Sequence, residues 1–194
     1  SSFVPYMTFI FKLFLNYLLF KKILFLDPKK TKLIKINIDD QSEIGSDLVA
    51  NSIAARALYK SNIIIVDFGT ALTFTAISNN GEIIGVSIFP GLKTAINSLY
   101  KNTAKLPKVL LGIPKKVIAK NTVESIQSGI FFGYSGLVKE ILSKMKNELS
   151  GETKVIATGG MSKVISSLER YFNDIIPTLT LDGLLLFSKE ITYK

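Results

Sequence analysis

Cysteine and histidine are both absent from this chain of 194 residues. Without cysteine there is no disulfide framework, no thiolate zinc site and no cysteine nucleophile. Without histidine the chain lacks the commonest acid–base side chain and cannot form a Ser-His-Asp triad. Any catalysis must therefore rest on carboxylates, lysines, hydroxyls, backbone amides or a bound ion.

Arginine is scarce although the net charge is +9, because lysine supplies most of the positive charge. The two arginines are Arg56 and Arg170, and the lysines are spread along the whole chain. Arginine makes the commonest base-specific contacts in nucleic-acid complexes. We therefore expect no nucleic-acid partner.

A long apolar run is also lacking, even in the hydrophobic N-terminal stretch. Between Lys12 and Lys21 the uncharged run has only eight residues and includes Asn16. A membrane-spanning helix needs about 20 predominantly apolar residues. We expect no membrane anchor, and residues 6–20 are predicted to form an amphipathic helix packed on a sheet.

The chain is rich in apolar residues, at 47%, and their spacing alternates between strand and helix periods. Strands are predicted over residues 22–26, 32–38, 63–68, 71–78, 82–89 and 154–158. Helices are predicted from Ser46 or Asp47, after Pro90-Gly91, from near Asn121, from Ser162 to about Tyr171, and over residues 180–191. This order of elements indicates a mixed α/β domain.

An aspartate interrupts the most strand-like segment, "IIIVDFGTALTF", residues 63–74. Asp67 follows four buried-looking residues, and Gly69 and Thr70 come directly after it. A carboxylate, a glycine and small hydroxyl residues suit a phosphate or a cation that neutralises one. A hairpin in which Asp67 only satisfies turn amides is equally consistent with this segment.

Three other stretches carry polar residues at predicted strand ends or helix starts: "GSDLVAN" (45–51), "KNTVESIQSGI" (120–130) and "ATGG" (157–160). Each has a purely structural alternative. Asp47 could be a helix N-cap, Thr122 or Asn121 could cap the long helix, and Gly159-Gly160 could be a tight turn. Taken together, they lie where α/β sheets gather their ligands.

The order and spacing of these stretches resemble the type III pantothenate kinase family. The matching text is "GSDLVANSIAA", "VDFGTALTF", "IFPGLKTAINSLYKNTAKLP", "KNTVESIQSGIFFGYSGLV" and "VIATGG". The resemblance implies a sugar-kinase, actin-like fold built from two ribonuclease-H-like halves, here residues 1–60 and 61–194. It further implies ATP-dependent phosphorylation of pantothenate, the first committed step towards coenzyme A, in a cytoplasmic homodimer.

At the substrate end, the resemblance implies that Asp47 is the catalytic base. It implies that Gly45, Ser46, Asp47 and Leu48 form the loop that contacts pantothenate, and that Thr122 contacts pantothenate as well. The positive end of a helix favours a carboxylate at this place, and an aspartate can accept the proton of an attacking hydroxyl.

At the nucleotide end, the resemblance implies that Asp67 is the ligand of a monovalent cation, potassium or ammonium. It implies that Gly69 and Thr70 contact ATP, which arrives with magnesium, and that Gly159 and Gly160 form the turn near the adenosine. Phosphoryl transfer depends mainly on positioning and charge neutralisation, which such a set can supply.

The chain departs from the family pattern at four positions, where it carries Ile38, Leu48, Leu72 and Val86. Leu48 replaces an arginine, so an acidic substrate loses a charge-assisted hydrogen bond worth roughly 1.5–3 kcal/mol. Ile38 stands where the family commonly has tyrosine.

The family's first phosphate loop, Asp-x-Gly-Asn-Thr, has no counterpart here, and "SSFVP" matches a segment that lies further along in the family. We therefore expect an N-terminally truncated chain with an incomplete first half that binds ATP poorly and turns over little. Two alternatives remain at this stage: a degenerate, non-catalytic relative with a regulatory or binding role, and a kinase of the same fold with another substrate.

Overall fold

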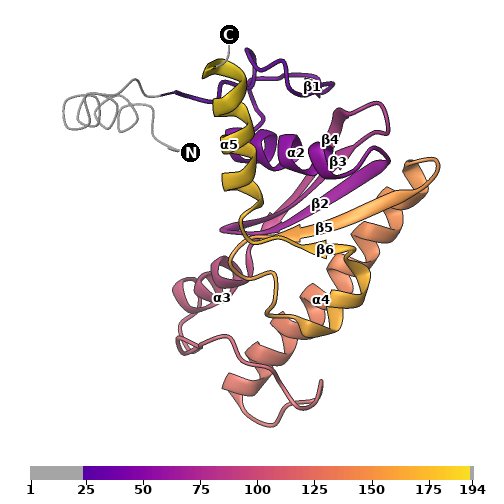
Figure 1. Ribbon diagram of the computed structural model, residues 1–194. Helices are drawn as coiled ribbons and strands as arrows, with labels where there is room; N and C mark the ends of the chain where they lie inside the picture. The colour runs from indigo at the N-terminus through magenta and orange to yellow at the C-terminus, as the bar shows by residue number, and fades with distance from the viewer. Residues whose placement is uncertain (1–23, 193–194) are drawn as a thin grey trace, which may run out of the picture.

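The computed structural model describes residues 24–192 and contains one six-stranded sheet covered by helices on both faces (Figure 1). The strands are β1 (Lys35–Ile36), β2 (Asn62–Phe68), β3 (Ala71–Ile77), β4 (Glu82–Pro90), β5 (Thr153–Thr158) and β6 (Asp174–Ile175). The helices are α2 (Ser46–Leu58), α3 (Leu92–Lys101), α4 (Thr122–Glu148), the short 3-10 helix η1 (Ser166–Tyr171) and α5 (Leu179–Thr192).

The sheet order is β1-β4-β3-β2-β5-β6. Strands β2, β3 and β4 form an antiparallel meander, whereas β5 pairs parallel to β2 and β6 pairs parallel to β5. Three antiparallel strands followed by two parallel ones are the ribonuclease-H-like arrangement, so the predicted actin-like α/β fold is confirmed. The predicted boundary between residues 60 and 61 stays a prediction, and β1 joins the same sheet through β4.

Strand β2 is buried on both faces, which explains its unbroken run of apolar residues. Ile64, Val66 and Phe68 belong to the core beneath α4, while Ile63 and Ile65 belong to the core beneath α2 and α5. Side chains alternate between the two faces of a strand, so Asp67 lies on the side of α2 and α5. The helices on that side therefore decide what surrounds its carboxylate.

Most elements match the sequence prediction, with three corrections. The strand expected over residues 22–26 is wrong for residues 24–26, which are irregular, and the strand expected over residues 32–38 is reduced to Lys35–Ile36. The helix expected from Ser162 is also wrong, because only Ser166–Tyr171 is helical and it has 3-10 geometry. Its three-residue repeat places Ile165 and Leu168 together in the core. The helix predicted over residues 6–20 lies outside the described residues.

Candidate functional site

The first part of the candidate site is the N-terminus of α2. Gly45 is the N-cap residue, with extended backbone and no side-chain cap, and Asp47 lies in the first helical turn. The alternative in which Asp47 caps the helix is therefore wrong. A Cβ atom on Gly45 would overlap the carboxylate of Asp47, so glycine leaves room for that carboxylate beside the cap. Ser46 and Asp47 are partly exposed, whereas Leu48 is buried.

The second part is Asp67, next to the carboxyl end of β2. Its carboxylate accepts a hydrogen bond from the side-chain amide of Asn51 on α2, at 3.0 Å from Asp67 Oδ2. The turn amide of Gly69 donates to the backbone oxygen of Ala71 instead. Asp67 is therefore held by a helix on one face of the sheet, and the alternative in which it serves the turn amides is not what the structure shows.

The electrostatic environment of Asp67 is unusual for an aspartate. Burial raises the pKa of its carboxyl above the ordinary value, the hydrogen bond from Asn51 lowers it, and the negative charge of Asp47 raises it further. Asn51, which donates to Asp67, lies one helical turn after Asp47 on α2, so Asp47 is on the same side of that helix. The start of α2 and the end of β2 are thus linked through the Asn51–Asp67 hydrogen bond.

Two threonines flank Asp67 in the sheet. Thr73 on β3 and Thr158 on β5 are its register partners, so all three side chains lie on the same face. Both threonine hydroxyls are buried and have no hydrogen-bond partner among the described residues. An unpaired buried hydroxyl costs about 1–3 kcal/mol, so a bound ion or an ordered water that contacts this pair would stabilise the fold.

A carboxylate flanked by two orphaned hydroxyls is an all-oxygen donor set, the type that hard cations prefer. Within residues 24–192 no group of three or more acidic, histidine or cysteine side chains could hold a metal ion. A single carboxylate with neutral oxygens fits a monovalent cation better than a divalent one, because the positive charge to be balanced is smaller. The residues present therefore fit the expected cation at Asp67.

Two glycines allow close backbone packing beside Asp67. Gly159 has a φ of 89°, and a Cβ atom there would lie 2.5 Å from Asp67 Oδ1 and 2.7 Å from the backbone carbon of Phe68. A Cβ atom on Gly91 would overlap the backbone oxygens of Gly69 and Thr70. The turn after β5 and the first residues of α3 thus pack closely against the segment that follows Asp67.

The remaining residues expected at the nucleotide end lie at the surface of these turns. Gly69, Thr70 and Gly160 are exposed, and the backbone oxygen of Thr70 accepts hydrogen bonds from Gly91 N and from the hydroxyl of Thr94. Nothing lies within 4 Å of a Cβ atom placed on Gly160. The structure therefore brings the turns together and leaves their outer surface open.

Thr122 is the one expected site residue that lies elsewhere. It is the first residue of α4, on the opposite face of the sheet from α2 and α5, while Asn121 supplies the N-cap by accepting from Glu124 N at 2.9 Å. Thr122 borders a pocket of about 280 Å³ between α3 and α4. Within this chain it does not join Asp47.

The departures at Ile38, Leu48 and Val86 meet around one pocket of about 280 Å³ beside the start of α2. The other residues that line it are Asp39, Asp40, Glu43, Ile44 and Ile88. Three acidic and no basic side chains border this pocket. These three departures from the family pattern are far apart in the sequence, but they alter the lining of the same pocket.

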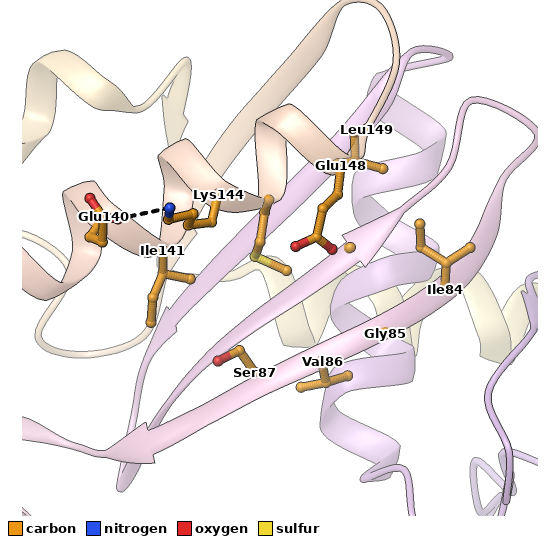
Figure 2. Close-up of a pocket in the computed structure, with 11 residues that line it drawn as sticks. Ile84, Gly85, Val86, Ser87, Glu140, Ile141, Lys144, Glu148 and Leu149 are labelled. Atoms are coloured by element: carbon orange, nitrogen blue, oxygen red, sulfur yellow. Dashed lines mark ion pairs between the residues drawn. The ribbon is translucent and has the colours of Figure 1, made fainter.

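A further pocket of about 380 Å³ lies between β4 and α4 (Figure 2). Ile84, Val86 and Ser87 line it from the strand, and Lys144 forms an ion pair with Glu140, at 3.6 Å, along the helix. It contains none of the ten expected site residues. This pocket is therefore separate from the candidate site.

Sequence reasoning did not assign four residues to the site: Asn51, Thr73, Thr158 and Thr180. Asn51 stands in the "GSDLVAN" stretch that was singled out, seventh of its seven residues and one turn after Asp47. The hydroxyl of Thr180 on α5 donates to Asn51 Oδ1 at 2.7 Å. No local signal marks Thr180, because its partner is far away in the sequence.

Known proteins resemble this chain in sequence over most of its length. Residues 1–144 match the model of the type III pantothenate kinase family. A type III pantothenate kinase of Dehalococcoides mccartyi is 45% identical over 151 residues, covering 78% of this chain and 58% of the relative. One from Koribacter versatilis is 43% identical over 163 residues, covering 84% and 60%. The chain thus spans about three fifths of the length of these curated relatives.

A solved structure supports the fold. A conserved Baf family protein from Campylobacter jejuni superposes with a TM-score of 0.56 at 21% identity, covering 84% of this chain and 71% of the other. At this identity the likeness concerns the fold alone. Among residues 24–192, no helix is both long and apolar enough to span a bilayer.

Proposed function

Because the chain belongs to the type III pantothenate kinase family, we propose that it takes part in the ATP-dependent phosphorylation of pantothenate. The observation that carries the proposal is the hydrogen bond from Asn51, one turn after Asp47 on α2, to Asp67 beside the turn of Gly159. The family's cytoplasmic location is part of the same proposal.

In this reaction Asp47 is the general base. Its carboxylate accepts the proton of the pantothenate hydroxyl while that oxygen forms a bond to the γ-phosphorus of ATP. The bond between the γ-phosphorus and the bridging oxygen breaks, and ADP leaves with the bridging oxygen. Gly45, Ser46 and Leu48 hold the substrate beside the base, at the helix start where α2 has no side-chain cap.

On the nucleotide side, Asp67 would hold the monovalent cation, together with the unpaired hydroxyls of Thr73 and Thr158. When bound, such a cation neutralises part of the charge of the phosphates. Gly69 and Thr70 would face the phosphates, and the turn of Gly159 and Gly160 would border the adenosine. The open surface at Gly160 leaves space for a ligand.

A homodimer belongs to this proposal, because Thr122 lies on the far face of the sheet from Asp47. If Thr122 contacts pantothenate, it does so in the site of a second copy. Sedimentation analysis tests this part, with a dimer as the expected result and a monomer at working concentration as the contradicting one.

The transfer step is tested in single turnovers, with radiolabelled ATP, pantothenate and the chain in excess. We expect phosphopantothenate to form in potassium, and Asp47→Asn to slow it at least about 100-fold while pantothenate binding persists. Glu140→Gln is the matched control, since Glu140 is an exposed carboxylate on α4, on the other face of the sheet. Equal rates for Asp47→Asn and the control would exclude Asp47 as the base.

The acidic pocket at Leu48 favours a second candidate, a non-catalytic relative with a binding or regulatory role. No basic side chain lines that pocket, so the carboxylate of pantothenate finds no positively charged partner there. Binding without product in the single-turnover assay supports this candidate. Preference for a related neutral alcohol over pantothenate would instead indicate a kinase with another substrate.

A further inference from the structure

We propose that Thr180, on the C-terminal helix, is a positioning residue that holds the Asn51 amide against the Asp67 carboxylate, so that α5 completes the candidate site. The proposal rests on the function proposed above in one respect, the cation at Asp67. Thr180 lies beyond residues 1–144, the part of the chain that matches the family model.

The argument begins with the chain of hydrogen bonds. Thr180 Oγ1 donates to Asn51 Oδ1 at 2.7 Å, and Asn51 Nδ2 donates to Asp67 Oδ2 at 3.0 Å. Asn51 is fully buried, with no exposed surface. Its amide therefore depends on these neighbours to satisfy it.

The orientation of the amide follows from the chemistry of its partners. An ionised carboxylate only accepts hydrogen bonds, so the NH₂ group of Asn51 must face Asp67. Its oxygen then faces α5 and needs a donor, which the hydroxyl of Thr180 supplies. Without that hydroxyl, a buried carbonyl oxygen is left unpaired and the amide loses the contact that fixes its rotation.

The packing of α5 on α2 positions the hydroxyl of Thr180 beside Asn51. A Cβ atom on Gly183 would overlap the backbone oxygen of Ala50, so the two helices touch at backbone distance. Thr180 and Gly183 are three residues apart on α5 and face the same side, while Ala50 and Asn51 are neighbours on α2. The close crossing at Gly183 thus places Thr180 opposite Asn51 (Figure 1 shows α5 beside α2).

The two hydrogen bonds, from Thr180 to Asn51 and from Asn51 to Asp67, orient the carboxylate of Asp67. Its neighbours in the sheet, Thr73 and Thr158, have unpaired hydroxyls, so Asn51 is the only described side chain that donates to its carboxylate. Partners that orient a ligating carboxylate typically change metal affinity about 10–100-fold when removed. Thr180 would therefore affect the site although it does not touch Asp67.

The first experiment is a spectroscopic one on the full 194-residue chain. The side-chain amide resonances of Asn51 are followed in ¹⁵N-labelled protein for wild type, Thr180→Val and the matched control Thr180→Ser. Valine keeps the shape and removes the hydroxyl, whereas serine keeps the hydroxyl. We expect the Asn51 pair to move in the valine variant and to stay in place in the serine variant. Coincident spectra for wild type and Thr180→Val would overturn the proposal.

The second experiment measures the potassium-dependent rise in melting temperature, against choline chloride at equal ionic strength. Thr180→Val should need about tenfold more potassium than wild type for the same rise, and Thr180→Ser should stay within about twofold. An unchanged potassium dependence in Thr180→Val overturns the proposal. If wild type shows no potassium-specific rise while the Asn51 resonances respond as expected, the positioning role stands and the cation assignment fails.

Discussion

Replacing Gly159 with alanine tests whether the turn after β5 is built around Asp67. The φ of 89° lies in the left-handed region, where a residue with a Cβ atom costs about 1–2 kcal/mol. The new Cβ atom would also lie 2.5 Å from Asp67 Oδ1 and 2.8 Å from the backbone nitrogen of Phe68. Overpacking of this kind costs about 1–3 kcal/mol. We expect a total loss of about 2–5 kcal/mol.

Such a loss is large compared with the stability of an ordinary domain, about 5–15 kcal/mol. It corresponds to a fall in melting temperature of about 4–20 °C for a chain of this size. Urea unfolding followed by circular dichroism measures this loss. The shift in the urea midpoint gives the change in unfolding free energy, provided that the dependence of this free energy on urea concentration is the same in both proteins.

The matched control is Gly160→Ala, one residue further on. No heavy atom lies within 4 Å of a Cβ atom at Gly160, and its φ is not positive, so the free energy of unfolding should change by less than about 1 kcal/mol. If Gly159→Ala costs less than about 1 kcal/mol, or no more than the control, the close packing against Asp67 and Phe68 is refuted.

Three further predictions concern Asp67, the helix crossing and the long helix. Burial raises the pKa of Asp67 in the folded chain above its ordinary value of 3.8. As pH rises, the unfolded chain therefore loses this proton at a lower pH than the folded chain does. The contribution of this carboxyl to the free energy of unfolding falls as pH rises from about 3.8 through the raised value. Asp67→Asn should therefore gain stability relative to wild type over that range, and a flat difference in urea titrations would contradict this. Gly183→Ala should lose about 1–3 kcal/mol by pushing α5 away from Ala50, whereas Gly136→Ala, in open space on α4, should lose none in the same assay. Asn121→Ala should cost about 1 kcal/mol of unfolding free energy by removing the α4 N-cap, and an unchanged midpoint would exclude that role.

Local patterns predicted the central strands and helix starts well. The run from Ile63 to Val66 is buried on both faces, so no periodicity was needed to identify it, and its end at Phe68 matches the prediction. The helix expected from Ser162 failed because burial of Ile165 and Leu168 at a three-residue spacing favours a tight 3-10 turn over an α-helix.

Contacts between distant segments were not predictable from these patterns. Thr180 meets Asn51 across 129 positions of sequence, and only the crossing of α2 and α5 at Gly183 brings them together. Thr122 resembled a site residue in the linear pattern, yet α4 packs on the opposite face of the sheet from α2. The side on which a helix packs follows from how the chain connects parallel strands, which is a property of the whole fold.

The sequence by itself determined the residue types and their order: a carboxylate at a helix start, a second one at a strand end, and glycines in the turns between. These are local properties, because capping, strand burial and turn geometry depend on a few neighbouring residues. Only the tertiary structure decided which of these residues meet. The register of β3 and β5 against β2 placed two unpaired hydroxyls beside Asp67, and the packing of α5 on α2 supplied its hydrogen-bond support. Such meetings depend on contacts between segments far apart in the chain, which no local pattern contains.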